Sequence, residues 1–286
     1  MTNVFTVKGL RYRYPKAPKD ALKGLDFEVR EGEIFGLLGP SGAGKSTTQK
    51  ILTKLLENYE GTISCLGEDL RKTGRAYYER IGVGFEMPVH FTKLTAMENL
   101  KFFKGFYKKT ADIEELLIRV GLWEHRDIRV GEYSKGMKVR LNFVRAMINM
   151  PQILFLDEVT NGLDPVNARV IKDMIAEFRQ NGGTVFLTTH LMSDVEQLCD
   201  RVAFCVEGKL SEVSTPRELK LRYGTREVKL EYRDVDELHK LSFPMAGIGG
   251  NDEFIRILRE KEIETLHSGE TSMEEIFIRV TGVKAV

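Results

Sequence analysis

The spacing of apolar residues changes along the chain and predicts its secondary structure. Residues 33–38, 153–156 and 184–187 form nearly continuous apolar runs, typical of parallel strands that are buried on both faces. Other short strand candidates lie at 4–7, 25–29, 61–66 and 81–85. These segments indicate a fold that is rich in β-structure in its first two thirds.

Helical spacing separates these strands in two places. From Thr95 to about Met150 the apolar residues recur three or four positions apart, so we expect a helical insertion at about 88–150. Later, Asp164 followed by Pro165 is a strong helix start, and the glycine pair at 182–183 ends that helix. The resulting order of strand, helix and strand predicts an α/β core within residues 1–222.

The pattern shifts again around residues 223–225. We expect short strands at 228–232 and 254–258 and a final helix at 272–280, where Thr271-Ser-Met-Glu274 resembles a capping box. Residues 223–286 are therefore predicted to form a small α+β appendage. This segment holds no catalytic constellation, which favours a dimerisation or regulatory role.

Composition excludes several classes of protein. In 286 residues, Lys and Arg number 43 against 42 Asp and Glu, so the basic excess typical of nucleic-acid binding is absent. No apolar run approaches the roughly 18 to 20 residues that cross a bilayer, and the N-terminus lacks signal-peptide features, so we expect a soluble, cytosolic chain. The isolated thiols of Cys65, Cys199 and Cys205 are expected to be buried and reduced.

The stretch GPSGAGKST at 39–47 predicts a phosphate-binding loop. Its glycines let several backbone N–H groups converge on one anion, and the following helix adds its positive N-terminal end. In the pattern G-x-x-x-x-G-K-[ST], Lys45 reaches the β- and γ-phosphates and the Ser46 hydroxyl ligates Mg²⁺. We expect the helix after the loop to present one apolar face, made of Ile51, Leu52, Leu55 and Leu56. Kinases, switch proteins, motors and transporters all use such loops.

Two adjacent carboxylates end the buried run ILFLDE. The carboxyl ends of parallel strands share one sheet edge with the phosphate loop, so Asp157 and Glu158 are expected to face the same ligand. Alternation along the strand separates their directions. We therefore expect Asp157 to hold Mg²⁺ through water, and Glu158 to orient or deprotonate the water that attacks the γ-phosphate.

The motifs together resemble one family. GPSGAGKST, YSKGM, ILFLDE, NGLD and the lone His190 occur in the order found in ATP-binding-cassette (ABC) ATPases, over about residues 4–222. The helix that begins at YSKGM, directly before ILFLDE, discriminates this family from kinases and small GTPases. The resemblance implies an α/β P-loop NTPase core with a mixed or parallel sheet, an N-terminal antiparallel β subdomain and the helical insertion, followed by the α+β appendage.

The resemblance also implies roles for single residues. ATP and Mg²⁺ are the implied ligands, with His190 as the switch histidine at the γ-phosphate and Glu158 as the catalytic carboxylate. Tyr14 is implied to stack on adenine, with Tyr12 as its rival. Ser134 and Gly136 are implied to meet ATP bound to a second copy of the chain. The remaining implied ATP contacts are Gly39, Ser41, Gly42, Ala43, Gly44, Lys45, Ser46, Thr47, Glu86 and Asp164, and the implied metal ligands are Ser46, Glu86 and Asp157.

The family resemblance suggests a transporter subunit. Two copies, or this chain and a homologous ATPase subunit, would close over two ATP molecules and drive a separate transmembrane permease that docks near residues 85–106. The run DEVTNGLDP and the C-terminal tail resemble ATPase subunits of type-two ABC exporters, which attach to the cytoplasmic face of the membrane through the permease. The alternative is a soluble ABC-type clamp or assembly factor. The basic aromatic stretch 101–109 is expected to be an amphipathic helix rather than a nucleic-acid patch.

The sequence departs from the family at one position. After the strand at 81–85 the family has Gln, whereas this chain has Glu86 followed by Met87. No Gln occurs between Gln49 and Gln152, so a shift of register cannot restore one. A carboxylate keeps an oxygen for a hard cation and loses the amide donors, so we expect Glu86 to make ATP binding more dependent on Mg²⁺.

Overall fold

The computed structural model describes residues 2–87, 89–234 and 237–283. The chain divides into two compact units, Met1–Thr215 and Pro216–Val286. The division lies seven residues before the expected boundary at 222/223, because helix α8 (Pro216–Tyr223) packs against α10 (Met273–Thr281) in the second unit. The expected start of the helical insertion at Pro88 and the last three residues of the appendage lie outside the described residues.

A mixed sheet forms the centre of the first unit. Its strand order is β10-β9-β3-β8-β7-β6, and all neighbours run parallel except β9 and β10. Strands β3, β7 and β8 are buried on both faces, as their apolar runs predict. The strands are β3 (Ile34–Leu38), β6 (Ile81–Gly84), β7 (Ile153–Asp157), β8 (Thr184–Thr189), β9 (Arg201–Val206) and β10 (Lys209–Ser214).

An antiparallel sheet of order β2-β1-β4-β5 packs against the central sheet, as expected. The Phe5 ring lies edge-on to Phe155, with ring centroids 5.8 Å apart, and Phe27 stacks on Phe35 at 5.6 Å. These contacts join both sheets in one core. The strands are β1 (Asn3–Tyr12), β2 (Leu22–Arg30), β4 (Glu60–Cys65) and β5 (Glu68–Asp69).

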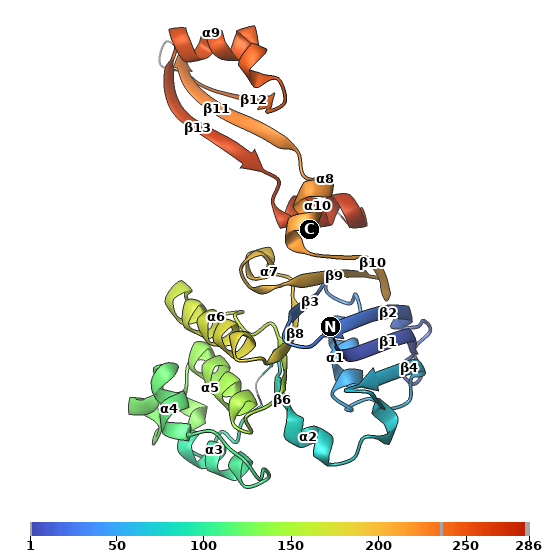
Figure 1. Cartoon of the computed structure of the whole chain (residues 1–286). Helices are drawn as coiled ribbons and strands as arrows, with labels where there is room; N and C mark the ends of the chain where they lie inside the picture. Colours follow the sequence, from blue (N-terminus) through green and yellow to red (C-terminus); the bar gives the residue numbers. More distant parts are fainter. Residues whose placement is uncertain (1, 88, 235–236, 284–286) are drawn as a thin grey trace. The chain divides into compact units, whose positions relative to one another are not determined.

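Helices complete the first unit, and Figure 1 places the helical insertion and the antiparallel sheet on opposite sides of the central sheet. Helix α1 ends at Leu52, earlier than expected, and Lys54 has a positive φ of 58°. Leu55 is consequently exposed, whereas Leu56, beyond the end of the helix, is partly buried and packs against the same core as Ile51 and Leu52. The helices are α1 (Lys45–Leu52), α2 (Ala76–Arg80), α3 (Ala96–Lys104), α4 (Ile113–Arg119), α5 (Lys135–Met147), α6 (Pro165–Gln180) and α7 (Met192–Leu198).

The second unit is an antiparallel sheet of order β12-β11-β13 with helices. The strand expected at 254–258 is wrong, because these residues belong to helix α9, which Asn251 caps by accepting from the Phe254 N–H at 2.9 Å. Phe254 and Ile257, three positions apart, are the buried residues of that helix. The final helix does begin with a capping box, but one position later than expected: Ser272 and Glu275 form it, rather than Thr271 and Glu274. The remaining elements are β11 (Arg226–Asp234), β12 (Glu237–Pro244), α9 (Asp252–Glu260) and β13 (Glu262–Glu270).

Candidate functional site

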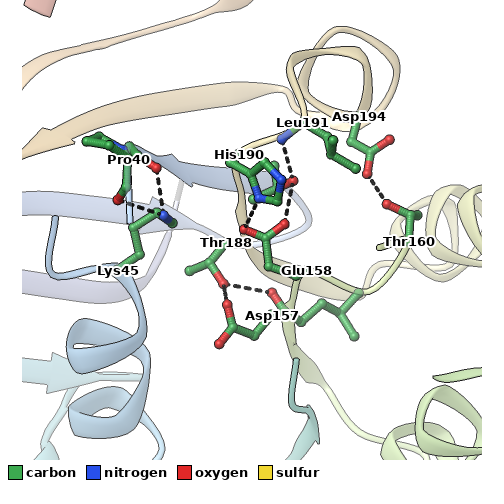
Figure 2. A network of polar contacts seen from close by, with 12 residues as sticks. Pro40, Lys45, Asp157, Glu158, Thr160, Thr188, His190, Leu191 and Asp194 are labelled. Atoms are coloured by element: carbon green, nitrogen blue, oxygen red, sulfur yellow. Dashed lines mark hydrogen bonds and ion pairs between the residues drawn. The ribbon is translucent and has the colours of Figure 1, made fainter. Parts of the chain in front are cut away.

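The predicted phosphate loop connects β3 to α1, as its sequence context requires. Two glycines allow the loop to approach the neighbouring elements closely: a Cβ on Gly39 would lie 2.1 Å from the Cys205 carbonyl oxygen, and one on Gly44, at φ 110°, would lie 2.6 Å from Leu22. The buried Lys45 donates from Nζ to the carbonyl oxygens of Gly39 at 2.6 Å and Pro40 at 3.1 Å. Its ammonium group is therefore held inside the loop, as Figure 2 shows.

The other residues of the phosphate loop differ in their exposure to solvent. Ser41 and Gly42 are exposed, whereas Ala43 is buried and its carbonyl oxygen accepts from the Cys205 thiol at 3.0 Å. Burial raises the pKa of Cys205 to about 11, so this thiol stays protonated and serves the packing of the loop. The expectation of buried, reduced cysteines is confirmed.

Tyr14 adjoins the start of α1. Its hydroxyl lies 3.1 Å from Oγ1 of Thr47, a buried residue, while Ser46 before it stays partly exposed. Tyr12, the other candidate for adenine stacking, is buried, and its ring lies edge-on to Tyr14 with centroids 4.9 Å apart. Tyr14 is therefore the partly exposed tyrosine beside the loop.

Asp157 ends β7 and is buried beside β8. Its register partner on β8 is Thr188, whose hydroxyl donates to Asp157 Oδ1. The same hydroxyl lies 3.1 Å from the side chain of Gln49 on α1. The carboxylate is thus linked to the helix that follows the phosphate loop.

Glu158 lies at the turn that leaves β7 and is joined to the end of β8. It adopts a left-handed conformation with φ 51°, and its N–H donates to the Thr188 carbonyl at 2.9 Å. His190 donates from Nδ1 to Glu158 Oε1 at 2.7 Å, and the Thr189 hydroxyl donates to Oε2 at 3.3 Å. The Glu158 side chain is 6% exposed and that of His190 is 53% exposed, so a buried carboxylate is paired with an accessible imidazole (Figure 2).

The YSKGM helix starts beside a different loop. Ser134 is exposed and caps α5 by accepting from the Met137 N–H at 3.2 Å. A Cβ on Gly136 would lie 3.5 Å from the Leu163 side chain. The exposed Asp164 caps α6, and the hydrogen bond from the Asn167 side chain lowers its pKa. Within one chain, the start of this helix therefore borders the loop at 162–164.

Helix α5 holds the segment around Glu86. Glu86 is exposed two residues after the end of β6, a parallel neighbour of β7. Asn142 donates from Nδ2 to the Phe85 carbonyl at 2.8 Å, and Arg145 donates from Nη1 to the Val89 carbonyl at 2.6 Å. The helix whose N-terminus carries YSKGM thus fixes the backbone on both sides of Glu86.

Three polar residues outside the motifs, Thr160, Lys172 and Asp194, connect the loop after β7 to helices α6 and α7. Asp194 on α7 is 3% exposed and accepts from the Thr160 hydroxyl just after Glu158. Lys172 on α6 forms an ion pair with Asp194 at 2.6 Å. The sequence analysis did not identify this group. The position of Asp194, four residues after His190, is the signal that could have indicated it.

Comparison with known proteins identifies the family. A family model described as ABC transporter matches residues 22–161. A fluoroquinolones export ATP-binding protein of Mycobacterium tuberculosis is 50% identical over 283 residues, which cover 98% of this chain and 94% of that protein. The chain belongs to the ABC transporter family. The ABC ATPase predicted from the motifs is confirmed, and the chain is an ATP-binding enzyme that hydrolyses ATP.

Further comparisons extend along this ABC chain. The bacitracin transport ATP-binding protein of Bacillus licheniformis is 33% identical over 281 residues, 90% of this chain and 91% of that protein. A solved structure of the ATP binding subunit of an ABC transporter is 28% identical to this chain, with a TM-score of 0.70. The match covers 77% of this chain and 93% of the solved chain, and it confirms the P-loop α/β fold. In the second unit, residues 226–270 match a model described as fluoroquinolone efflux ABC transporter C-terminal domain. Within the described ranges, no helix of this ABC chain is both long and apolar enough to cross a membrane.

Proposed function

We propose that the chain pairs with a second copy, or with a homologous ATPase subunit, around two ATP molecules and drives export through a separate membrane-spanning subunit. The observation that carries this proposal is the meeting of Lys45, Asp157 and the Glu158–His190 pair at one edge of the central sheet. That edge is where ligands bind in open α/β sheets.

The phosphate loop accounts for ATP binding. When ATP arrives, its β- and γ-phosphates would replace the carbonyls of Gly39 and Pro40 as partners of Lys45. Tyr14, beside Thr47, would face the adenine. Because the ammonium group of Lys45 already lies inside the loop where the phosphates would bind, ATP binding would require little rearrangement of this side chain.

The donors around the loop fit Mg²⁺. Ser46 and Asp157 offer a hydroxyl and a carboxylate, and Glu86 offers a second carboxylate beyond the adjacent strand β6. No three His, Cys, Asp or Glu side chains gather as a cage in the described part of the chain. This donor set suits Mg²⁺, which typically uses one or two carboxylates with substrate phosphates and water. Bound there, Mg²⁺ would screen the negative charge of the phosphates.

Glu158 and His190 supply the proposed chemistry. Glu158 would accept a proton from the attacking water at a carboxylate oxygen, after His190 shifts its hydrogen bond toward the γ-phosphate. Thr189 remains within 3.3 Å of the other carboxylate oxygen. The accessible imidazole can thus respond to the nucleotide while the carboxylate stays fixed.

A second ATPase subunit would complete each site. Ser134 and Gly136 lie at an exposed helix start beside the 162–164 loop, where they can serve a nucleotide held by a partner. A solved ATP-binding cassette, described as dimeric and bound to ADP and Pi, has this fold, with a TM-score of 0.67 at 23% identity. Asp164, which follows Leu163 in the loop next to Gly136, would transmit the state of one site to the other.

An exposed apolar surface next to Glu86 is the proposed permease contact. Phe102 packs edge-on against Phe91 at 5.0 Å and against Phe106 at 5.2 Å, although all three rings are about half exposed. Clusters of exposed aromatic residues are typical of protein interfaces. The permease surface comprises Met87, Val89, Phe91, Phe102 and Phe106. Arg145 on α5 donates to the Val89 carbonyl, and Asn142 on the same helix donates to the Phe85 carbonyl, so α5 connects this surface to the segment that follows β6.

The exported substrate class that we propose is the fluoroquinolones. This rests on the relative that is 50% identical over 98% of the chain and on the match of residues 226–270. Purifying the tagged chain from membranes and identifying its partner by mass spectrometry tests the membrane complex. A stable complex with a polytopic membrane protein and drug-stimulated ATP hydrolysis are expected. Recovery only with soluble partners would favour the clamp or assembly factor.

A further inference from the structure

Gln49 is a buried polar residue on α1 that none of the motifs explains. It follows Lys45 by one helical turn, is 2% exposed, and its Nε2 atom has no hydrogen-bond partner. Leaving a buried amide donor unpaired is destabilising, because the group has lost its hydrogen bonds to water. An apolar residue would avoid that cost at a position that faces the central sheet.

The hydroxyl of Thr188 is the polar group that Gln49 reaches. Its oxygen lies 3.1 Å from Gln49 Oε1 and 3.3 Å from the Leu156 carbonyl, and its nearest acceptor is Asp157 Oδ1. A hydroxyl has only one proton to donate, and the charged oxygen forms the stronger bond. Gln49 must therefore donate to Thr188 rather than accept from it.

Rotation of the terminal amide of Gln49 satisfies this requirement. The rotation interchanges the amide oxygen and nitrogen and places Nε2 3.1 Å from Thr188 Oγ1. The unpaired donor then gains an acceptor, and the proton of Thr188 is committed to Asp157. A continuous relay results, from the amide N–H through the hydroxyl to the carboxylate.

We propose that Gln49 is a positioning residue for Asp157. The relay ties α1, β8 and β7 together, so the helix that follows the phosphate loop fixes the orientation of the carboxylate. This inference rests on the proposed Mg²⁺ site. Removing a hydrogen-bond partner of a metal-binding side chain typically weakens metal affinity by about 10- to 100-fold.

The test is an equilibrium titration of ATP, in chelator and in Mg²⁺, with Gln49→Met and Thr188→Val. Methionine keeps the length and volume of glutamine without the amide. We expect both variants to bind metal-free ATP like wild type. The factor by which Mg²⁺ increases their ATP affinity should be about tenfold smaller than in wild type. The double variant should lose no more than Thr188→Val alone, because the two residues act in series.

Two controls separate the relay from general packing. Thr188→Ser retains the hydroxyl and should retain the Mg²⁺ effect. Thr53→Val removes a different buried hydroxyl, which donates to the Gln49 carbonyl at 2.9 Å. This variant should also retain the Mg²⁺ effect on ATP affinity. Should Gln49→Met fail to fold, Gln49→Leu replaces it.

The outcomes distinguish the two proposals. An unchanged Mg²⁺ effect in Gln49→Met, additive losses in the double variant, or an equal loss of metal-free ATP affinity would overturn the relay. If wild type itself gained no affinity from Mg²⁺, the proposed metal site would fail, and the relay with it.

Discussion

His190 donates from Nδ1 to Oε1 of Glu158 at 2.7 Å, which joins the end of β8 to the turn after β7. The carboxylate is buried and the imidazole is half exposed. In this arrangement the proposed base is occupied by His190. In the mechanism that we propose, the pair must therefore open when the γ-phosphate is present.

Replacing Glu158 with Gln should separate binding from chemistry. The amide keeps the size and an oxygen for His190 but cannot accept the proton, so we expect hydrolysis to fall at least about 100-fold. ATP affinity should be unchanged, and size-exclusion chromatography with ATP should show a stable dimer. Glu207→Gln, at an exposed glutamate, is the matched control. A variant that remains monomeric with saturating ATP would contradict the two-subunit site.

Replacing Ser134 with Arg should impair turnover without affecting ATP binding by the monomer. The exposed start of α5 has room for a long side chain, but this side chain would block a nucleotide from the partner. Because Ser134 caps the helix, the change also costs about 1 kcal/mol of stability. Ser134→Asn keeps a capping side chain and serves as the control. Equal losses of monomer affinity and turnover in Ser134→Arg would show that Ser134 acts within its own chain.

Replacing Glu86 with Gln should make ATP binding less dependent on Mg²⁺. The exposed carboxylate near the end of β7 would repel the γ-phosphate unless a cation lies between them. Removing that charge should tighten metal-free ATP binding by about fivefold, the effect of one charge at about 4 Å in water. Titration of ATP with Mg²⁺ and with chelator measures the difference. Identical Mg²⁺ dependence in both proteins would exclude Glu86 from the metal site.

His90 should make the first unit less stable at low pH. Its Nε2 donates to the Lys138 carbonyl at 3.1 Å, and burial, with Arg145 and Lys138 nearby, lowers its pKa to about 4. The unfolded chain protonates this imidazole near pH 6.5, so between pH 6.5 and 4 unfolding takes up a proton and stability falls as the pH falls.

The matching variant is His90→Gln, which can still donate to Lys138 and does not titrate. Its melting temperature should fall less than that of wild type between pH 7 and pH 5. Parallel decreases in the two proteins would mean that His90 does not contribute to the acid sensitivity.

Replacing Lys172 with Met should destabilise the first unit by about 3 kcal/mol, because it leaves a buried carboxylate without its cation. The ion pair to Asp194 is 2.6 Å long, and the two side chains are 13% and 4% exposed. Denaturant unfolding measures the loss. Adding Asp194→Asn should restore part of it, since the uncompensated charge is gone. A loss below 0.5 kcal/mol would identify the pair as energetically neutral.

The sequence by itself determined the features that depend on neighbouring residues. The phosphate loop was predicted because its backbone geometry is encoded within residues 39–47, and the start of α6 because Asp164 accepts hydrogen bonds from N–H groups two and three positions ahead. The buried strands β7 and β8 were predicted because continuous apolar runs are stable only when both faces are covered. The roles assigned to these residues remain predictions.

Only the tertiary structure decided the features that depend on distant partners. A short apolar segment such as 254–258 is compatible with both a strand and a helix. It forms a helix in the folded protein, where Phe254 and Ile257 are buried on one helical face. The boundary at 215/216 follows from the packing of α8 against α10, about fifty residues later in the chain. Gln49 meets Thr188 across 139 positions. Such contacts are fixed by the packing of whole elements, which local sequence patterns do not specify.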